Sequence, residues 1–488
     1  MKRIVVVGGG LAGIAAAKRL VSCGSFDVKL LEAKDRLGGR CHSIRLSGVG
    51  VDMGASLFHG AKGNVMFETA QAHGFVSSES IPRSDKKKLI LLSDGTSVPC
   101  EVLERYRVLF ECVMDRLHEE QWKESKLELN DYLTTEFFKE AKEVQELNGG
   151  VSMHSLQEDP YMYPAFRCLL TEVGMDEGTR LCQGVGVSSF TEFDYLEGPH
   201  DNEFLGGHCY GDLVQELAKS LPEDIVNYET EVRSIEWNTC SSSRSGEEKL
   251  NLPIIVHTSE GDFFADHVIV TVSLGVLKAV TQSSPTQAFF TPPLPEDKLK
   301  AIAAIGYGIL NKVIMEFDEP ILDQSVYLLW KAEHIQNDPV VKKYPWLASL
   351  NSIQRLSNSS VYCVSFAGVD AHQIVSLPEE EVVTALLKIV GDRFLCKTLP
   401  PLKRAFRSNW GEDPCFLGSY SFNTPHSNTR HREALARPLS GSAPLQVLFA
   451  GEATHLTHFS ATHGAFESGV REAERLIHYY GNNSNSTD

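Results

Sequence analysis

The fold of this chain is decided by residues 3–40, which read RIVVVGGGLAGIAAAKRLVSCGSFDVKLLEAKDRLGGR. Residues 3–7 form a short β-branched run of the kind found in a fully buried strand. Residues 11–22 are rich in alanine and predict a helix, and residues 27–31 predict a second strand. This strand–helix–strand order predicts the first unit of a parallel, Rossmann-like sheet.

The turn between the first strand and the helix has the spacing of a dinucleotide-binding site. Gly8, Gly10 and Gly13 follow the strand as G-x-G-x-x-G, and Glu32 ends the second strand. The glycines allow a tight turn and the close approach of a pyrophosphate, while the helix N-terminus offers N–H groups and a positive dipole end. An acid at the position of Glu32 accepts a hydrogen bond from a ribose hydroxyl. We therefore expect these four residues to bind a dinucleotide.

A second glycine pair, Gly38 and Gly39, follows Glu32 closely and is itself followed by Arg40. A guanidinium beside such a turn can bind a pyrophosphate from its other side. The arrangement resembles the N-terminus of the flavin-containing amine oxidases and differs from that of the nicotinamide dehydrogenases. The resemblance implies FAD as the cofactor, with Arg40 among its ligands.

Composition places the chain among ordinary globular proteins. Of its 488 residues, 42% are hydrophobic and 23% are charged, and a chain of this length is expected to hold about three domains. The net charge of −18 disfavours nucleic acid and anionic membranes as partners and favours a small polycation. No window approaches the ~20 apolar residues of a membrane span.

The cysteines and the chain ends lead to expectations about metals and location. Eleven cysteines are scattered without a C-x-x-C pair, so we expect no metal site and a reduced, cytoplasmic protein. The first strand begins at residue 3, which leaves no room for a signal peptide. The C-terminal Ser-Thr-Asp is not a peroxisomal signal of the Ser-Lys-Leu type. We also expect a monomer.

The rest of the chain alternates between parallel-sheet character and other patterns. A helical periodicity covers residues 101–147, and buried strands return at 267–272 and 447–450. We expect an FAD-binding domain from residues 1–80, 203–285 and 430–480, a substrate-binding domain from 81–202 and 286–429, and a disordered tail at 481–488. The predicted fold class is α/β and α+β: a Rossmann-like domain interleaved with a mixed sheet and helices, as in the amine oxidase fold.

Motifs along the whole chain resemble those of the flavin-containing amine oxidases. They lie at residues 8–13, 37–40, 267–275, 311–312 and 448–454. Residues 418–421 and 462–465 resemble more narrowly the animal polyamine oxidases, which include spermine and acetylpolyamine oxidases.

This resemblance assigns further cofactor contacts. Glu452 would meet the sugar-phosphate part of the flavin nucleotide, and Val232 would bind the adenine through its backbone. Gly464 and Ala465 would present N–H groups from a helix start to the flavin ring. A helix N-terminus there would stabilise the negative charge that reduction leaves on the ring.

The same resemblance assigns three catalytic residues. Lys312 lies inside an apolar strand, where a lysine is costly unless it is paired, and matches the lysine that holds a water against the flavin N5. His59 matches a pocket histidine of the polyamine oxidases. Tyr420 matches an aromatic residue that packs on the substrate amine. We expect His59 and Tyr420 also to contact the substrate.

Two further positions concern the substrate. Glu192 matches an acid of the polyamine oxidase pattern, and a carboxylate there could pair with a distal ammonium group. Ala461 stands where other amine oxidases place a second aromatic ring, next to Thr462, which we expect to touch the substrate. A small residue here leaves one wall open and suits a long substrate.

These features predict an FAD-dependent oxidase that acts with O2 on a secondary amine of a polyamine and yields an aldehyde, a shorter amine and H2O2. The choice between spermine and acetylated polyamines stays open. An L-amino-acid oxidase would need a cation for the substrate carboxylate, and Arg167 and Arg407 have no assigned place. A lysine demethylase of this family would carry a long helical insertion. A silent flavin-binding scaffold would not need Lys312, His59 and Tyr420.

Overall fold

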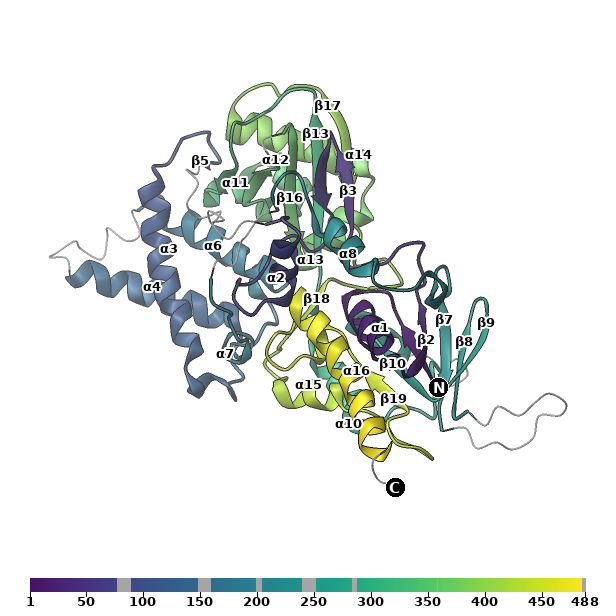
Figure 1. Cartoon of the computed structure of the whole chain (residues 1–488). Coiled ribbons are helices and arrows are strands. Elements are labelled where there is room, and N and C mark those ends of the chain that lie inside the picture. The colour runs from purple at the N-terminus through teal and green to yellow at the C-terminus, as the bar shows by residue number, and fades with distance from the viewer. Residues whose placement is uncertain are drawn as a thin grey trace.

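The computed structural model describes residues 1–76, 89–147, 159–198, 204–238, 252–282, 288–357 and 359–484. Figure 1 shows a parallel sheet near the N-terminus, a second large sheet at the top of the view and a group of helices at the left. The chain passes between these parts several times, and the α/β and α+β fold class is confirmed.

The parallel sheet is built from strands that lie far apart in the chain. Its order is β19 (Val447–Phe449), β10 (His267–Val270), β1 (Lys2–Val7), β2 (Phe26–Leu31) and β6 (Val226–Asn227). All neighbouring strands are parallel, and Val5 pairs with Val268 on one side and Lys29 on the other. The side chains of residues 4–7 are buried, which stabilises the fold by about 1.5–3 kcal/mol for each fully buried valine or isoleucine.

Helices α1 (Leu11–Cys23) and α16 (Thr462–Ser484) pack against each other beside the parallel sheet (Figure 1). The buried face of α1 includes Ala15, Ala16 and Ala17, whose small side chains let the helix approach its neighbours closely. Because α16 continues to Ser484, the prediction of a disordered tail is wrong for residues 481–484. Residues 485–488 lie outside the described ranges.

A smaller sheet packs near the parallel one. Its order is β11 (Phe290–Thr291), β7 (Val232–Glu236), β8 (Ile254–Thr258) and β9 (Gly261–Ala265). Ile235 and Val256 share a hydrophobic core with Val5 and Val7 of β1. This packing places the start of β7, with Val232, near the end of β2.

The second large sheet is the mixed sheet that the sequence predicted. Its order is β17 (Leu402–Arg407), β13 (Leu310–Phe317), β16 (Val361–Ala367), β15 (Ser352–Arg355), β14 (Val326–Leu329) and β5 (Leu89–Leu92). Neighbours are antiparallel except β14 and β5, which run parallel. Helices α13 (Gly368–Ser376) and α14 (Glu379–Ile389) share its core. Lys312 is the third residue of β13.

Two short ribbons connect the sheets. Strands β12 (Gly306–Gly308) and β18 (Tyr420–Phe422) form one ribbon, and β3 (Ser43–Leu46) and β4 (Val49–Asp52) form the other. Leu46 and Val51 of the second ribbon pack on Ile314 of β13. The loop that follows β4 is thereby held against the mixed sheet.

The predicted helical block at 101–147 is broken in its middle. It forms α3 (Cys100–Asp115) and α4 (Leu129–Leu147), which pack with α6 (Met162–Asp176) around Phe110, Phe137 and Phe166 (Figure 1). In the part of the chain that the structure describes, the other α-helices are α2 (Val65–Ala72), α7 (Ser188–Glu192), α8 (Tyr210–Ala218), α9 (Leu274–Gln282), α10 (Glu296–Ala304), α11 (Ala332–Asn337), α12 (Pro339–Lys343) and α15 (Thr429–Ala436). Within the described ranges no helix has the length and apolar character needed to cross a bilayer, and each cysteine there is a free thiol.

Candidate active site

One large cavity, of about 900 Å³, collects most of the residues that the sequence singled out. It is lined by Gly8, Gly10, Glu32, Arg40, His59, Val232, Lys312, Tyr420, Glu452, Thr462 and Ala465. Gly13, Glu192 and Gly464 are not among the residues that line it. The cavity therefore extends from the end of β1 to β13 of the mixed sheet and to the start of α16.

The turn after β1 leaves room for a ligand backbone. A Cβ at Gly10 would meet no atom within 4 Å, so open space adjoins the start of α1. Gly13 has a different role, because a Cβ there would lie 1.9 Å from the carbonyl oxygen of Gly8. Gly13 thus permits the close packing of helix on turn, and Gly8 and Gly10 face the cavity.

Glu32 is buried at the end of β2, beside this turn. Its carboxylate accepts hydrogen bonds from the backbone N–H of Gly9 at 2.7 Å and of Lys34 at 2.9 Å. Burial raises the pKa of Glu32 above its ordinary value, and these two bonds and the nearby Arg36 and Lys34 charges oppose that rise. The acid is held where a ribose hydroxyl would reach it.

The partly buried Arg40 and the buried Glu452 form an ion pair in the cavity wall. Arg40 Nη1 lies 3.1 Å from Glu452 Oε1 and also donates to the carbonyl oxygen of Ser419. Burial would lower the pKa of Arg40, but Tyr307 and Glu452 outweigh it and raise the pKa. The other Glu452 oxygen accepts from Ser421 Oγ at 2.7 Å and from the N–H of Ser460 at 2.9 Å.

Arg432 of α15 joins the same network, and no motif in the sequence pointed to it. It donates to Ser421 Oγ at 2.9 Å, to Asn423 Oδ1 at 3.1 Å and to the carbonyl oxygen of Ala453 at 3.2 Å. Its guanidinium lies 3.7 Å from the ring centroid of Phe459. Because the side chain is fully buried, it holds β18 and the segment before α16 together.

Lys312 is buried in β13, and its ammonium group is well bonded. Nζ donates to the carbonyl oxygens of Asp52 at 3.0 Å and Gly54 at 2.7 Å, and to Ser56 Oγ at 3.1 Å. These partners belong to the end of β4 and the loop after it, about 260 positions earlier in the chain. Lys312 therefore both lines the cavity and anchors the loop that leads to His59.

His59 and Tyr420 line the cavity from two different elements. The backbone carbonyl of His59 accepts a hydrogen bond from Asn64 Nδ2 at 3.1 Å, which holds the turn before α2. Tyr420 lies in β18 and donates its hydroxyl to the carbonyl oxygen of Met175. Burial raises the pKa of Tyr420, so its hydroxyl stays protonated at neutral pH.

At the start of α16, the amide of Ala465 differs from the expectation, while the prediction for the Gly464 amide stays a prediction. A Cβ at Gly464 would lie 1.8 Å from the carbonyl oxygen of His458, so Gly464 packs on the preceding segment. The N–H of Ala465 already donates to the carbonyl oxygen of Ala461 at 3.1 Å. Thr462 lines the cavity, and its hydroxyl is hydrogen-bonded to Tyr210 at 3.0 Å.

Four acids line the cavity on the side of α3 and α6, and the sequence analysis did not identify them. Asp176 and Glu177 stand at the end of α6, and Glu172 and Glu111 line the same side. Burial, and then the Asp176 charge, raise the pKa of Glu177 to about 8. Burial likewise raises the pKa of Asp176, although this residue is exposed where it lines the cavity. An acidic pair at the end of a largely apolar helix was the signal that could have identified Asp176 and Glu177.

Glu192 does not join this acidic group. Its carboxylate accepts from Asn423 Nδ2 at 2.7 Å and from the N–H of Thr429 at 2.8 Å, the first residue of α15. An acid at a helix N-terminus is a stabilising cap. The prediction that Glu192 faces the substrate cavity is therefore wrong for this structure. Of its acidic neighbours, Glu197 pairs with Lys62 on the surface at 2.7 Å, and Asp201 lies outside the described ranges.

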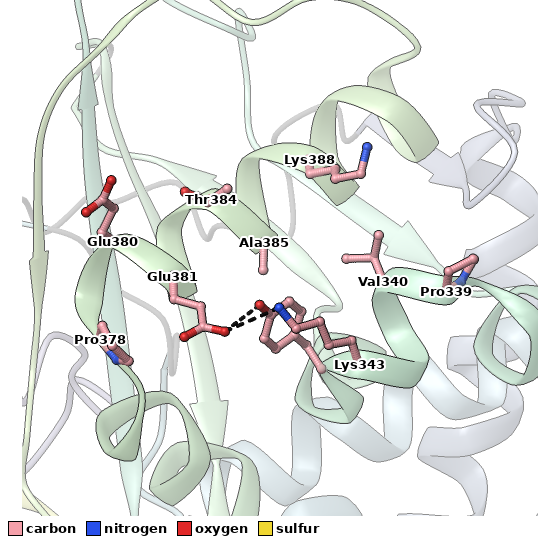
Figure 2. Close-up of a pocket in the computed structure, with 10 residues that line it drawn as sticks. Pro339, Val340, Lys343, Pro378, Glu380, Glu381, Thr384, Ala385 and Lys388 are labelled. Atoms are coloured by element: carbon pink, nitrogen blue, oxygen red, sulfur yellow. Dashed lines mark hydrogen bonds and ion pairs between the residues drawn. The ribbon is translucent and has the colours of Figure 1, made fainter.

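A second hollow, of about 530 Å³, lies between α12 and α14 on the surface (Figure 2). Three of its polar groups are paired with one another, since Glu381 accepts from Tyr344 at 2.5 Å and lies 3.5 Å from Lys343 Nζ. None of the predicted site residues lines it. It carries no chemistry comparable with that of the large cavity.

The large cavity fits a dinucleotide cofactor. The open space beside Gly10, the buried acid Glu32 at its edge and the Arg40–Glu452 pair supply the surroundings that a pyrophosphate and its riboses need. Lys312 and Tyr420 stand in the same cavity. A redox-active ring attached to that dinucleotide would therefore reach residues of the mixed sheet.

Comparison with known proteins agrees with this geometry. The family profile described as "Flavin containing amine oxidoreductase" matches residues 11–477. The human protein named "Peroxisomal N(1)-acetyl-spermine/spermidine oxidase" is 32% identical over 97% of this chain and 94% of its own length. "Probable polyamine oxidase 5" of Arabidopsis thaliana is 30% identical over 98% of both chains. "Polyamine oxidase 1" of Oryza sativa subsp. japonica is 30% identical over 99% of both chains. The chain therefore belongs to the family of flavin-containing amine oxidoreductases, whose cofactor is FAD.

Proposed function

We propose that this enzyme oxidises a secondary amine of a polyamine. The reaction consumes a substrate R–CH2–NH–R′ together with O2 and water, and it yields the aldehyde R–CHO, the shorter amine R′–NH2 and H2O2. The carbon beside the nitrogen loses a hydride, the resulting imine is hydrolysed, and O2 is reduced to H2O2. The observation that carries this proposal is the acidic side of the cavity, formed by Asp176, Glu177, Glu172 and Glu111. The polyamine oxidase names of its relatives support it.

The acids would position a long cation. A polyamine carries several ammonium groups, and carboxylates beside them form charge-assisted hydrogen bonds. Binding at Asp176 and Glu177 would hold the chain of the substrate so that a more central nitrogen stays free of its proton. That nitrogen must be neutral to release a hydride from its neighbouring carbon, and near-attack geometry requires reacting atoms within roughly 3–3.5 Å. A flavin bound in this cavity would supply the hydride acceptor and the two electrons that reduce O2.

Three residues of the chain would serve the chemistry. Lys312, fixed by its bonds to Asp52, Gly54 and Ser56, would hold a water near the flavin for imine hydrolysis. Tyr420 would pack on the substrate amine from β18. His59 would close the opposite wall. Glu32, Arg40, Val232 and Glu452 would bind the cofactor.

An L-amino-acid oxidase is less well supported by the geometry. Arg167 donates to the carbonyl oxygen of Ala348 at 3.2 Å, and Arg407 donates to those of Ile374 and Leu377, so both bind backbone outside the cavity. Arg107 does line the cavity, but Glu172 lies 3.0 Å from its guanidinium. A substrate carboxylate would have to compete with that ion pair.

A substrate panel tests the proposal. We would measure H2O2 release from spermine, N1-acetylspermine, spermidine and benzylamine at two ionic strengths. We expect the polyamines to have the higher kcat/KM, and salt to lower it because screening weakens attraction beyond about 8–10 Å. Glu177→Gln should lower kcat/KM for the polyamines by about tenfold, the loss of ~1.4 kcal/mol from one charged contact, and leave benzylamine unchanged.

The matched control is Glu197→Gln, which removes an acid outside the cavity and should behave as wild type. Benzylamine as the best substrate, with no effect of salt on any amine, would reject the polyamine assignment. The panel also decides between spermine and acetylated polyamines. The monomeric state, the cytoplasmic location and the lack of nucleic-acid binding stay predictions, open to sedimentation, imaging and mobility-shift measurements.

A further inference from the structure

Residues 455–461, here called the wall loop, separate the last short helical turn from α16 and form one side of the cavity. Phe459, Ser460 and Ala461 line the cavity directly. Ser460 has a left-handed backbone with φ of 65°, a conformation that a non-glycine residue adopts only when its surroundings hold it. The shape of this wall therefore depends on contacts that fix the loop.

The outer end of the wall loop is fixed by one carboxylate of α16. Glu467 Oε2 lies 2.8 Å from His458 Nδ1 and 3.1 Å from His455 Nε2. The two imidazole rings are stacked with centroids 4.8 Å apart and an interplanar angle of 6°. Burial would raise the pKa of Glu467, but the bonds from the two histidines outweigh it and lower the pKa to about 2. The acceptor is therefore ionised at any working pH.

The hydrogen bonds of His455 distinguish a metal site from a hydrogen-bonded cluster. Its Nδ1 accepts the backbone N–H of His458 at 2.8 Å and that of Thr457 at 3.4 Å. The ring proton must then be on Nε2, which donates it to Glu467. The three side chains have the composition and closeness of a metal site, yet a metal at Nε2 would require the proton to move to Nδ1, where it would face a backbone N–H. The geometry thus favours a hydrogen-bonded clamp over a metal centre.

The clamp also reaches the facing segment of the cavity. The carbonyl oxygen of Thr457 accepts the N–H of Asp194 at 3.0 Å. Phe193 packs edge-on against Phe459, with ring centroids 5.4 Å apart. Phe193 and Tyr195 both line the cavity. The wall loop and the segment at 193–195 are consequently held together as one side of the substrate space.

We propose that Glu467 is a positioning residue that sets substrate preference by clamping His455 and His458 and so fixing the wall loop. Glu467 does not line the cavity itself, and its effect passes through the loop to Phe459, Ser460 and Ala461. The proposal rests on the proposed function in one respect, because substrate preference is read with amines.

The test compares variants that break the clamp with one that keeps it. Glu467→Leu removes the acceptor, and His458→Phe removes one donor while it keeps a flat ring against His455. Glu467→Gln keeps the clamp, since both bonds go to a single oxygen and an amide oxygen can accept both. The matched control is Glu474→Leu on the same helix, where the acid pairs with Arg19 at 2.6 Å on the surface.

Two measurements are made on the FAD-loaded protein. Hydrogen–deuterium exchange of the peptide at 455–461 should accelerate by about tenfold or more in the two clamp-breaking variants. The ratio of kcat/KM for spermine to that for benzylamine should change by about fivefold or more, with FAD content unchanged. Glu467→Gln and Glu474→Leu should match the wild type in both measurements.

Three outcomes would overturn the proposal. One is wild-type exchange in both clamp-breaking variants, and another is faster exchange with an unchanged substrate ratio. The third is micromolar Zn²⁺ binding to the wild type that His458→Phe abolishes, since the histidines would then be ligands. Hydrogen–deuterium exchange does not depend on catalytic turnover. If the protein oxidises no polyamine, the proposed function is refuted, but the exchange measurement still tests the clamp.

Discussion

Binding of a polycation should release protons from the acidic side of the cavity. With its pKa raised to about 8 by burial and by Asp176, Glu177 is about nine-tenths protonated at pH 7. An ammonium group within ~4–6 Å lowers a carboxyl pKa by about 1–3 units. A lowering of about 2 units would leave about one-tenth of Glu177 protonated, so about 0.8 proton leaves per ligand bound. Asp176 adds less, because its pKa, raised to about 7, leaves it only about half protonated at pH 7.

Calorimetry measures this number directly. We would titrate the oxidised, FAD-loaded enzyme without O2 with 1,8-diaminooctane, a diamine that lacks a secondary amine, in buffers of different ionisation enthalpy. The slope of observed enthalpy against buffer enthalpy counts the protons released, and the flavin absorbance verifies that no reduction occurs. Glu177→Gln should remove most of the release and weaken binding. Glu197→Gln, outside the cavity, should leave both unchanged.

The carboxyl group of Glu177 also makes the stability of the protein depend on pH, and the direction of this dependence follows from the shift of its pKa. The folded-state pKa of Glu177 is raised above its ordinary value of 4.5, so its contribution to stability is present at low pH and is lost as pH rises toward about 8. The melting temperature of the ligand-free protein should therefore fall less between pH 5 and 8 in Glu177→Gln than in the wild type. Binding without proton release, together with identical pH profiles for the two proteins, would refute the reasoning.

Three further predictions concern single side chains. Lys312→Met should retain FAD but slow turnover by about tenfold or more, ~1.4 kcal/mol of barrier, and wild-type rates in both stopped-flow half-reactions would contradict this. Glu32→Ala should weaken FAD retention by about fivefold or more, as expected when a hydrogen bond of ~1 kcal/mol is lost, and release of the bound flavin measured by fluorescence checks it. Lys298→Met should lower the free energy of unfolding by about 1–3 kcal/mol, because Lys298 donates to the carbonyl oxygens of Ala434, Leu435 and Arg437 at the end of α15. An unchanged urea midpoint would reject that role.

Local features of the sequence were sufficient for one part of the dinucleotide site, the turn after β1 and Glu32, whereas the Arg40–Glu452 pair joins residues 412 positions apart. The glycine spacing, the alanine-rich helix and Glu32 all lie within residues 3–40, and their contacts join neighbours in the chain, such as Gly9 with Glu32. The parallel sheet and the mixed sheet were also predictable in kind, since short apolar runs mark most of their strands. The interruption between α3 and α4 was not, because both segments share one helical periodicity.

The substrate half depended on contacts between distant segments. Lys312 was recognisable as a buried strand lysine, but its partners lie about 260 positions away in the chain. Glu192 and Glu177 are both acids near helix ends, and only packing decides that the first caps α15 while the second faces the cavity. Local patterns determine which elements form because their hydrogen bonds are short-range. The burial, charge state and orientation of a side chain depend on the residues that the tertiary fold places beside it. These residues come from distant parts of the chain, so no single stretch of sequence determines them.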